Sequence, residues 1–155
     1  MLLTCFIVLT VIILLTIYDK LSKARMANER LSNYYRLTVQ WLKVKNRNKD
    51  IADYFRKNNY HSVAIYGLGE LGIRLCEELI YTEIKIAYLI DGSVDEAYFG
   101  PDGPKHINLE DEPFQIDADV IIITPVYDFQ RIKDRLLKKG ININIVSLND
   151  VIYGI

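Results

Sequence analysis

Residues 62–72, SVAIYGLGELG, decide the fold of this 155-residue chain. The stretch begins with a short apolar run that is typical of a buried strand, and it continues into a G-x-G-x-x-G turn at Gly67, Gly69 and Gly72. A helical pattern follows the turn through about Tyr81. A strand, a glycine-rich turn and a helix in this order form the context in which the motif binds nucleotide phosphates.

Each glycine of the turn has a predicted task. Gly67 permits the tight turn, Gly69 lets a phosphate approach the backbone, and Gly72 lets the helix pack closely on the strand. N–H groups at the start of a helix attract anions. We therefore predict phosphate contacts from Gly67, Leu68, Gly69, Glu70, Leu71 and Gly72.

A second strand is predicted over residues 84–90, and it ends at Asp91 and Gly92. Asp91 follows the last glycine of the turn at the distance where dinucleotide folds place an acid that binds ribose hydroxyls. An acid there favours NAD or a nucleoside diphosphate over NADP. The alternative is that the glycines serve only packing and that Asp91 merely ends a strand.

The following residues complete an α/β pattern. Thr124 and Pro125 end a buried strand at the edge where ligands bind, and Thr124 would either donate to a phosphate or ribose or cap the turn. We predict a three-layer Rossmann-like domain with a five-stranded parallel sheet of order 3-2-1-4-5, joined by right-handed crossovers. Its other expected elements are helices over residues 50–57, 109–112, 128–139 (capped by Gly140) and 147–153, and strands over 106–108, 119–125 and 141–146.

The N-terminal residues 2–18 contain no charged side chain. As a helix they would span roughly 25 Å, within the range of a membrane anchor. A cleaved signal peptide would need a basic start and a small-residue cleavage site, and a buried helix is rarely so uniformly aliphatic. Lys and Arg residues follow the segment, so the positive-inside rule predicts a single-pass cell-membrane protein with its N-terminus outside and its later domain in the cytoplasm.

Residues 19–48 are predicted to form a basic helical stalk, because residues 19–45 contain neither Gly nor Pro. Residues 19–49 hold nine Lys and Arg against two acids. Three interpretations remain open: a coiled-coil homodimer, a helix lying on anionic lipid, and a spacer whose aromatic end packs on the next domain. The predicted division is therefore 1–18 anchor, 19–48 stalk and 49–155 nucleotide-binding domain.

Composition and single residues exclude several classes. The net charge of −1 argues against nucleic acid as a partner, and two Cys and two His make neither a disulfide framework nor a metal site. Cys76 is interpreted as an inert core thiol. Tyr81 and Lys85 match the Tyr-x-x-x-Lys spacing of short-chain epimerases, but they fall at the sheet edge opposite the predicted ligand crevice. No catalytic site is predicted.

Four segments together resemble a known family: VAIYGLGELG (63–72), LID (89–91), ADVIIITP (118–125) and VSLNDVI (146–152). They are similar to the NAD(P)-binding, CoA-binding-like Rossmann domain of bacterial polysaccharide-biosynthesis proteins. That domain follows membrane helices in nucleotide-sugar dehydratases or epimerases and in polyprenyl-phosphate sugar transferases. The resemblance covers about residues 50–155 and implies nucleotide contacts at Gly67, Gly69, Gly72 and Asp91, with a glycosyltransferase or polysaccharide-assembly protein as partner.

The expected function is a membrane-anchored cytoplasmic module that binds NAD or a nucleotide sugar, as an accessory to cell-surface polysaccharide biosynthesis. One alternative is a nucleotide-sugar epimerase or dehydrogenase completed by a partner subunit, in which Thr124 or Tyr127 would take part. Another is a non-catalytic protein scaffold. A methyltransferase is less favoured, because its acceptor substrate normally requires a larger domain.

Overall fold

The computed structural model describes residues 2–92, 103–110 and 115–155, with side chains described from Phe6 onward. The chain divides into two compact units, residues 1–36 and 37–155. The boundary lies within helix α1 (Leu2–Asn46), so the last turns of this helix belong to the second unit.

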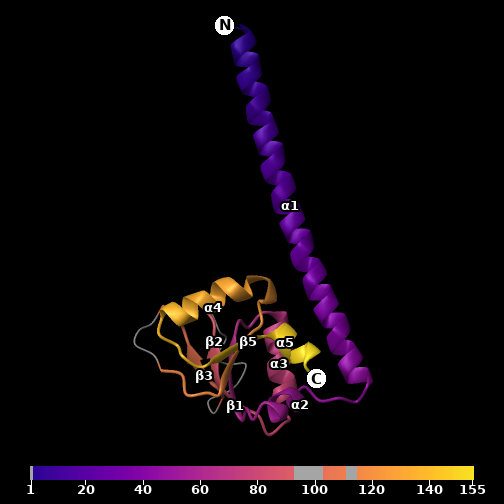
Figure 1. The fold of residues 1–155 in the computed structure, drawn as a ribbon, viewed down its shortest axis with the longest axis vertical. Helices are drawn as coiled ribbons and strands as arrows, with labels where there is room; N and C mark the ends of the chain where they lie inside the picture. Colours follow the sequence, from indigo (N-terminus) through magenta and orange to yellow (C-terminus); the bar gives the residue numbers. More distant parts are fainter. Residues whose placement is uncertain (1, 93–102, 111–114) are drawn as a thin grey trace. The chain divides into compact units, whose positions relative to one another are not determined.

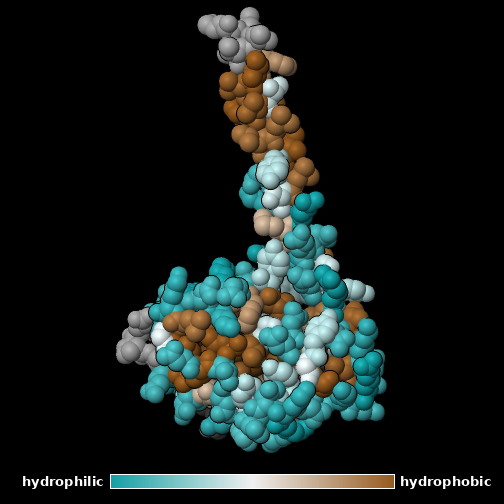
Figure 2. Space-filling view, in the orientation of Figure 1, coloured by the Kyte–Doolittle hydropathy of each residue, from teal (hydrophilic) through white to brown (hydrophobic). Residues whose placement is uncertain are grey.

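The first unit is the uninterrupted N-terminal part of α1, as the lack of Gly and Pro predicted. Large apolar side chains from Phe6 to Ile17 are exposed, and Figure 2 shows this hydrophobic surface giving way to hydrophilic residues further along the helix. Among the described residues, no helix has a stretch both long and apolar enough to cross a membrane. Residues 1–5 of the predicted anchor lie outside the described side chains. The helix ends at Asn46, close to Asn48, whose φ of 54° lies in the left-handed region.

The second unit contains a five-stranded sheet of order β3-β2-β1-β4-β5, which confirms the predicted topology. All four pairings between neighbouring strands are parallel. The strands are β1 (Ser62–Tyr66), β2 (Lys85–Ile90), β3 (Lys105–Ile107), β4 (Val120–Ile123) and β5 (Asn144–Ser147). The order reverses between β1 and β4, so the ligand crevice of such a sheet is expected at the carboxyl ends of these two strands.

Both faces of the sheet are buried, because successive strand side chains point to opposite sides. Val63 and Ile65 of β1 belong to one hydrophobic cluster, whereas Ala64 belongs to the other. The continuous apolar runs of β1 and β4 follow from this two-sided burial. They are typical of the inner strands of a parallel sheet.

Helices cover the two faces unequally. The first cluster includes α2 (Ala52–Lys57), α3 (Glu70–Leu79), α5 (Leu148–Tyr153) and the last turns of α1. The second cluster includes α4 (Phe129–Lys138), which follows the short helix η2 (Val126–Asp128). Figure 1 shows α4 on one side of the sheet and α3 and α5 on the other. These three layers are the predicted α/β architecture.

The end of α1 packs into the sheet-bearing unit through its aromatic residue. Trp41 is 7 % exposed, and its indole N–H donates to the Glu78 carboxylate of α3 at 2.8 Å. Lys45 pairs with the same carboxylate at 3.1 Å. The aromatic end of the stalk thus packs on the following domain, as one of the three interpretations predicted. The coiled-coil homodimer and the contact with anionic lipid stay predictions.

Several boundaries differ from those predicted. The last strand begins at Asn144, three residues later than expected, because residues 140 and 141 complete the end of α4. Gly140 adopts a φ of 81° just after the C-cap Lys139, and Ile141 N–H donates to Leu136 C=O at 3.2 Å. In the short helix predicted over 109–112, residues 109 and 110 form a turn and residues 111 and 112 lie outside the described residues.

Asp119 links the amino ends of β1 and β4 through hydrogen bonds. Its carboxylate accepts hydrogen bonds from the N–H groups of His61 at 2.7 Å and Ser62 at 2.8 Å. These donors hold the pKa of the Asp119 carboxyl below its usual value. A carboxyl with a lower pKa in the folded state stabilises the fold above its unfolded pKa, and this contribution disappears as pH falls through its folded pKa.

We expect Asp119→Asn to lower the free energy of unfolding at pH 7 by about 0.5–1 kcal/mol, a small value because the carboxylate is exposed and screened. The difference from the unmodified chain should shrink as pH falls below about 4. Urea denaturation at several pH values measures it, with Asp134→Asn on α4 as control. A difference that grows toward low pH would contradict the assignment.

Candidate functional site

At Gly67, the first glycine of the turn after β1, neighbouring atoms leave no room for a side chain. Gly67 has a φ of +88°, and a Cβ atom there would lie 2.7 Å from Cδ of Pro125. The Gly67 N–H donates to Ile90 C=O at 2.9 Å, and the Gly67 carbonyl accepts from the Thr124 hydroxyl at 2.6 Å. Both the backbone conformation and the close approach of β4 therefore require glycine at this position.

The third glycine brings α3 against the same turn. A Cβ atom on Gly72 would lie 2.0 Å from the carbonyl oxygen of Gly67, far inside any allowed contact. The start of α3 is therefore held directly beside the end of β1. This geometry corresponds to the close helix-to-strand packing assigned to Gly72 from the sequence.

At Gly69, the middle glycine of the turn, the described residues leave room for a side chain. Among the described residues, no atom lies within 4 Å of an ideal Cβ on Gly69. Gly69 is the N-cap of α3, and the first hydrogen bond of the helix runs from Ile73 N–H to Gly69 C=O at 3.0 Å. The N–H groups of Gly69, Glu70, Leu71 and Gly72 precede that bond, so they have no acceptor within the helix, as is typical of anion donors at a helix N-terminus.

Asp91 binds the turn itself. Its Oδ2 atom accepts a hydrogen bond from Leu68 N–H at 2.6 Å. The amides of Gly67 and Leu68, the first two of the predicted phosphate contacts, therefore donate to the protein's own oxygen atoms, and phosphate contact stays a prediction for the amides that follow. Asp91 is nevertheless among the residues that line the cavity at the carboxyl edge, where a ribose-binding acid is expected.

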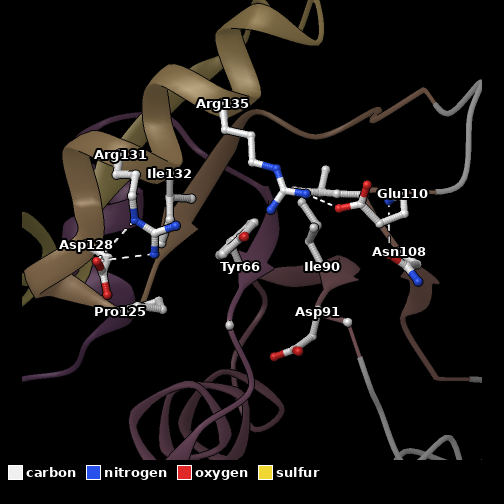
Figure 3. A pocket seen from close by; sticks show the side chains of 13 residues that line it. Tyr66, Ile90, Asp91, Asn108, Glu110, Pro125, Asp128, Arg131, Ile132 and Arg135 are labelled. Carbon is white, nitrogen blue, oxygen red and sulfur yellow. Dashed lines mark hydrogen bonds and ion pairs between the residues drawn. The ribbon is translucent and has the colours of Figure 1, made fainter.

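A cavity of about 490 Å³ lies beside the turn at the carboxyl ends of the strands. Its strand-side wall is formed by Tyr66, Gly67, Ile90, Asp91, Gly92, Asn108, Leu109, Glu110 and Pro125. Its helix-side wall is formed by Asp128, Arg131, Ile132 and Arg135. Figure 3 shows side chains from both walls facing the space between them. Its volume falls within the range of small-molecule sites.

Two arginines on the helix-side wall were not predicted from the sequence. Arg131 pairs with Asp128 at 3.2 Å, and Arg135 pairs with Glu110 across the cavity (Figure 3). In sequence they are ordinary cations of an amphipathic helix. The signal available was their four-residue spacing, which places both on the same face of a helix, together with a helix that starts directly after the Thr124–Pro125 strand exit.

Thr124 is 3 % exposed, and its hydroxyl proton is used within the turn, on the carbonyl of Gly67. The Thr124 hydroxyl thus bonds across to the glycine turn and does not cap the helix that follows it, because η2 has no side-chain cap hydrogen bond. Contact of Thr124 with a ligand stays a prediction. Pro125 and Gly92 both line the cavity, as residues of a binding site would. His106 approaches the Asp91 carbonyl oxygen through Nε2 at 3.1 Å, and this contact helps position the end of β2.

The Tyr-x-x-x-Lys pair noted in the sequence does not lie at the cavity. Tyr81 is 91 % exposed in the turn after α3, and Lys85 starts β2 at the amino edge of the sheet, away from the cavity. Among the described residues, no group of three or more His, Cys, Asp or Glu side chains is arranged to hold a metal ion. The cavity at the carboxyl edge is lined by the charged residues Asp91, Glu110, Asp128, Arg131 and Arg135.

Cys76 is buried in α3, and burial together with the neighbouring Glu77 raises the pKa of its thiol to about 12. We expect iodoacetamide to label it at least about a hundredfold more slowly than a free cysteine at pH 8, because the thiolate is both scarce and enclosed. Mass spectrometry of a Cys5→Ser variant measures this rate. Labelling in urea provides the control, and equally fast labelling of the folded chain would contradict the assignment.

These features define the class of the protein as a doubly wound parallel α/β fold with a glycine-rich turn beside a cavity. No family model matches the chain, and no curated protein or solved structure matches it either.

Proposed function

We propose that the sheet-bearing unit binds a nucleotide or nucleotide sugar of the NAD type at its carboxyl edge. The phosphates lie at the N–H groups of Gly69, Glu70 and Leu71, and the nucleoside lies in the adjoining cavity. One observation carries this proposal: among the described residues no side chain fills the space at the Cβ position of Gly69, whereas Gly67 and Gly72 are closed by the protein's own atoms. Close packing accounts for glycine at positions 67 and 72 but not at position 69.

The chemistry of the cavity suits a nucleoside. Ile90 and Ile132 provide apolar surface, and the Tyr66 ring provides an aromatic face for a base. Carboxylates of Asp91 and Asp128 accept hydrogen bonds from hydroxyl groups such as those of ribose. The phosphates need no cation at the turn, because helix N–H groups and the helix dipole stabilise their charge.

Thermal unfolding of the full chain in detergent tests this proposal. The single tryptophan, Trp41, lies in the core of the sheet-bearing unit, so its fluorescence reports unfolding of that unit. A ligand at a hundred times its dissociation constant stabilises a fold by about 2.7 kcal/mol, which raises Tm by several degrees. NAD, NADP, coenzyme A, UDP-glucose and UDP-glucuronate are tested at millimolar concentration. An unchanged Tm with all of them would overturn the proposal.

We further propose that residues 2–18 tether this unit to the cell membrane, with the N-terminus outside and the remainder in the cytoplasm. The support is the uncharged sequence of the segment and the exposed apolar side chains along it. Ile12→Lys with Ile13→Lys should release the chain from carbonate-washed membranes, because two charges at the centre of a span are costly. Leu31→Lys, further along α1, should leave it bound. Retention of the double variant in the membrane fraction would overturn the tether.

A role in cell-surface polysaccharide assembly, with a glycosyltransferase as partner, is the pathway part of the proposal. Its support is the sequence resemblance carried by residues 63–72, 89–91, 118–125 and 146–152.

A further inference from the structure

Two arginines stand one helical turn apart on the α4 wall of the cavity. Arg131 extends toward Asp128 and Arg135 extends past Tyr66 toward Glu110, as Figure 3 shows. Side chains four residues apart in a helix lie on the same face. The α4 wall of the cavity therefore carries two guanidinium groups, one directed toward Asp128 and the other toward Glu110.

These arginines are not required to hold α4 in place. The helix packs on the sheet through Ile132 and Leu136, which are 4 % and 0 % exposed. By contrast, the side chain of Arg131 is 72 % exposed and that of Glu110 is 69 % exposed. Exposed ion pairs contribute little to stability, so their exchange for another partner costs little.

The guanidinium group is suited to such an exchange. It carries five N–H donors, and it binds carboxylate and phosphate groups through two parallel hydrogen bonds. In the structure, the Arg131 guanidinium pairs with the Asp128 carboxylate. The Arg135 guanidinium pairs with the Glu110 carboxylate. An anionic group of a ligand inside the cavity would compete directly with Glu110, which reaches Arg135 from the other wall.

We propose that the ligand carries a second anionic group, in addition to its diphosphate, and that Arg131 and Arg135 bind it. The inference rests on the proposed function and narrows its ligand class to nucleotides with an extra carboxylate or phosphate. A uronic acid attached to the nucleotide and a phosphate attached to the ribose are the two sources of this chemistry. The Asp91 carboxylate would repel a phosphate on a ribose that lies beside it, so it disfavours the ribose phosphate as the source.

Matched ligand pairs test the proposal by calorimetry on the full chain in detergent. UDP-glucuronate differs from UDP-glucose by a carboxylate, and NADP differs from NAD by a ribose phosphate. We expect the member with the additional anionic group to bind about tenfold more tightly than its counterpart in one of the pairs. The pair that shows the preference identifies the source of the anionic group.

The variant Arg131→Gln with Arg135→Gln should abolish this preference, so that the two members of the pair bind with equal affinity. Lys133→Gln with Lys138→Gln is the matched control, because it removes two positive charges from α4 outside the cavity lining and should keep the preference. Arg131→Lys with Arg135→Lys keeps the positive charges but lacks the paired donors, so it should retain part of the preference. Trp41 fluorescence verifies that each variant is folded.

Equal affinities within both pairs, or a preference that persists in the glutamine variant, would overturn the inference and leave the proposed function intact. Failure of all four nucleotides to bind the unmodified chain would overturn the proposed function and the inference with it.

Discussion

Replacing Gly72 by alanine is expected to lower the free energy of unfolding by about 3 kcal/mol. The new Cβ atom would lie 2.0 Å from the Gly67 carbonyl oxygen, and a backbone atom cannot move aside as a flexible side chain can. Relief of the clash requires α3 to move away from β1, which disturbs the packing of Leu75 and Leu79. Urea denaturation followed through Trp41 fluorescence measures the loss.

Gly69→Ala is the matched control for this effect. It adds the same methyl group three residues earlier, where no described atom lies within 4 Å and where φ is −68°. We expect it to change the stability by less than about 1 kcal/mol. If Gly72→Ala were as stable as the unmodified chain, the close approach of α3 to the glycine turn would be wrong.

The second large effect concerns binding rather than folding. Gly69→Leu should weaken binding of the preferred nucleotide at least about a hundredfold, which corresponds to about 2.7 kcal/mol. The leucine side chain would fill the open space beside the N–H groups of Glu70 and Leu71. Calorimetric titration of the full chain with the nucleotide that raises its Tm most measures the change.

The two glycines differ in what their substitution affects: Gly72→Ala should lower stability, whereas Gly69→Leu should weaken nucleotide binding. Gly69→Leu should remain folded, and Gly69→Ala should show an intermediate loss of affinity because its side chain is smaller. Nucleotide binding that is unaffected by leucine at this position would show that the phosphates do not lie at the start of α3. The glycine turn would then serve only the packing of α3 on the sheet.

Much of the fold could be predicted because its signals are local. The apolar runs of β1 and β4 and the helical spacing of α4 are visible in the sequence, and parallel connections allow few strand orders. The glycine turn was predicted for the same reason. Only glycine suits both the positive φ of Gly67 and the close contact at Gly72.

Other features depend on contacts between distant residues, which a single sequence does not reveal. Asp91 was placed correctly at the end of β2, but its hydrogen bond to Leu68 N–H depends on the direction of one side chain. The burial of Trp41 depends on how the end of α1 meets α3. Arg135 reaches Glu110 only because α4 and the turn that follows β3 border the same cavity.

The most direct test of the central claim, that a nucleotide phosphate binds the start of α3, is a set of amide chemical shifts. The ¹H–¹⁵N spectrum of the full chain in detergent is recorded as the nucleotide that stabilises it most is added. We predict the largest shifts at the amides of Gly69, Glu70 and Leu71, with Leu68 also changing as its bond to Asp91 adjusts. Unchanged signals from these amides at saturating nucleotide would contradict it.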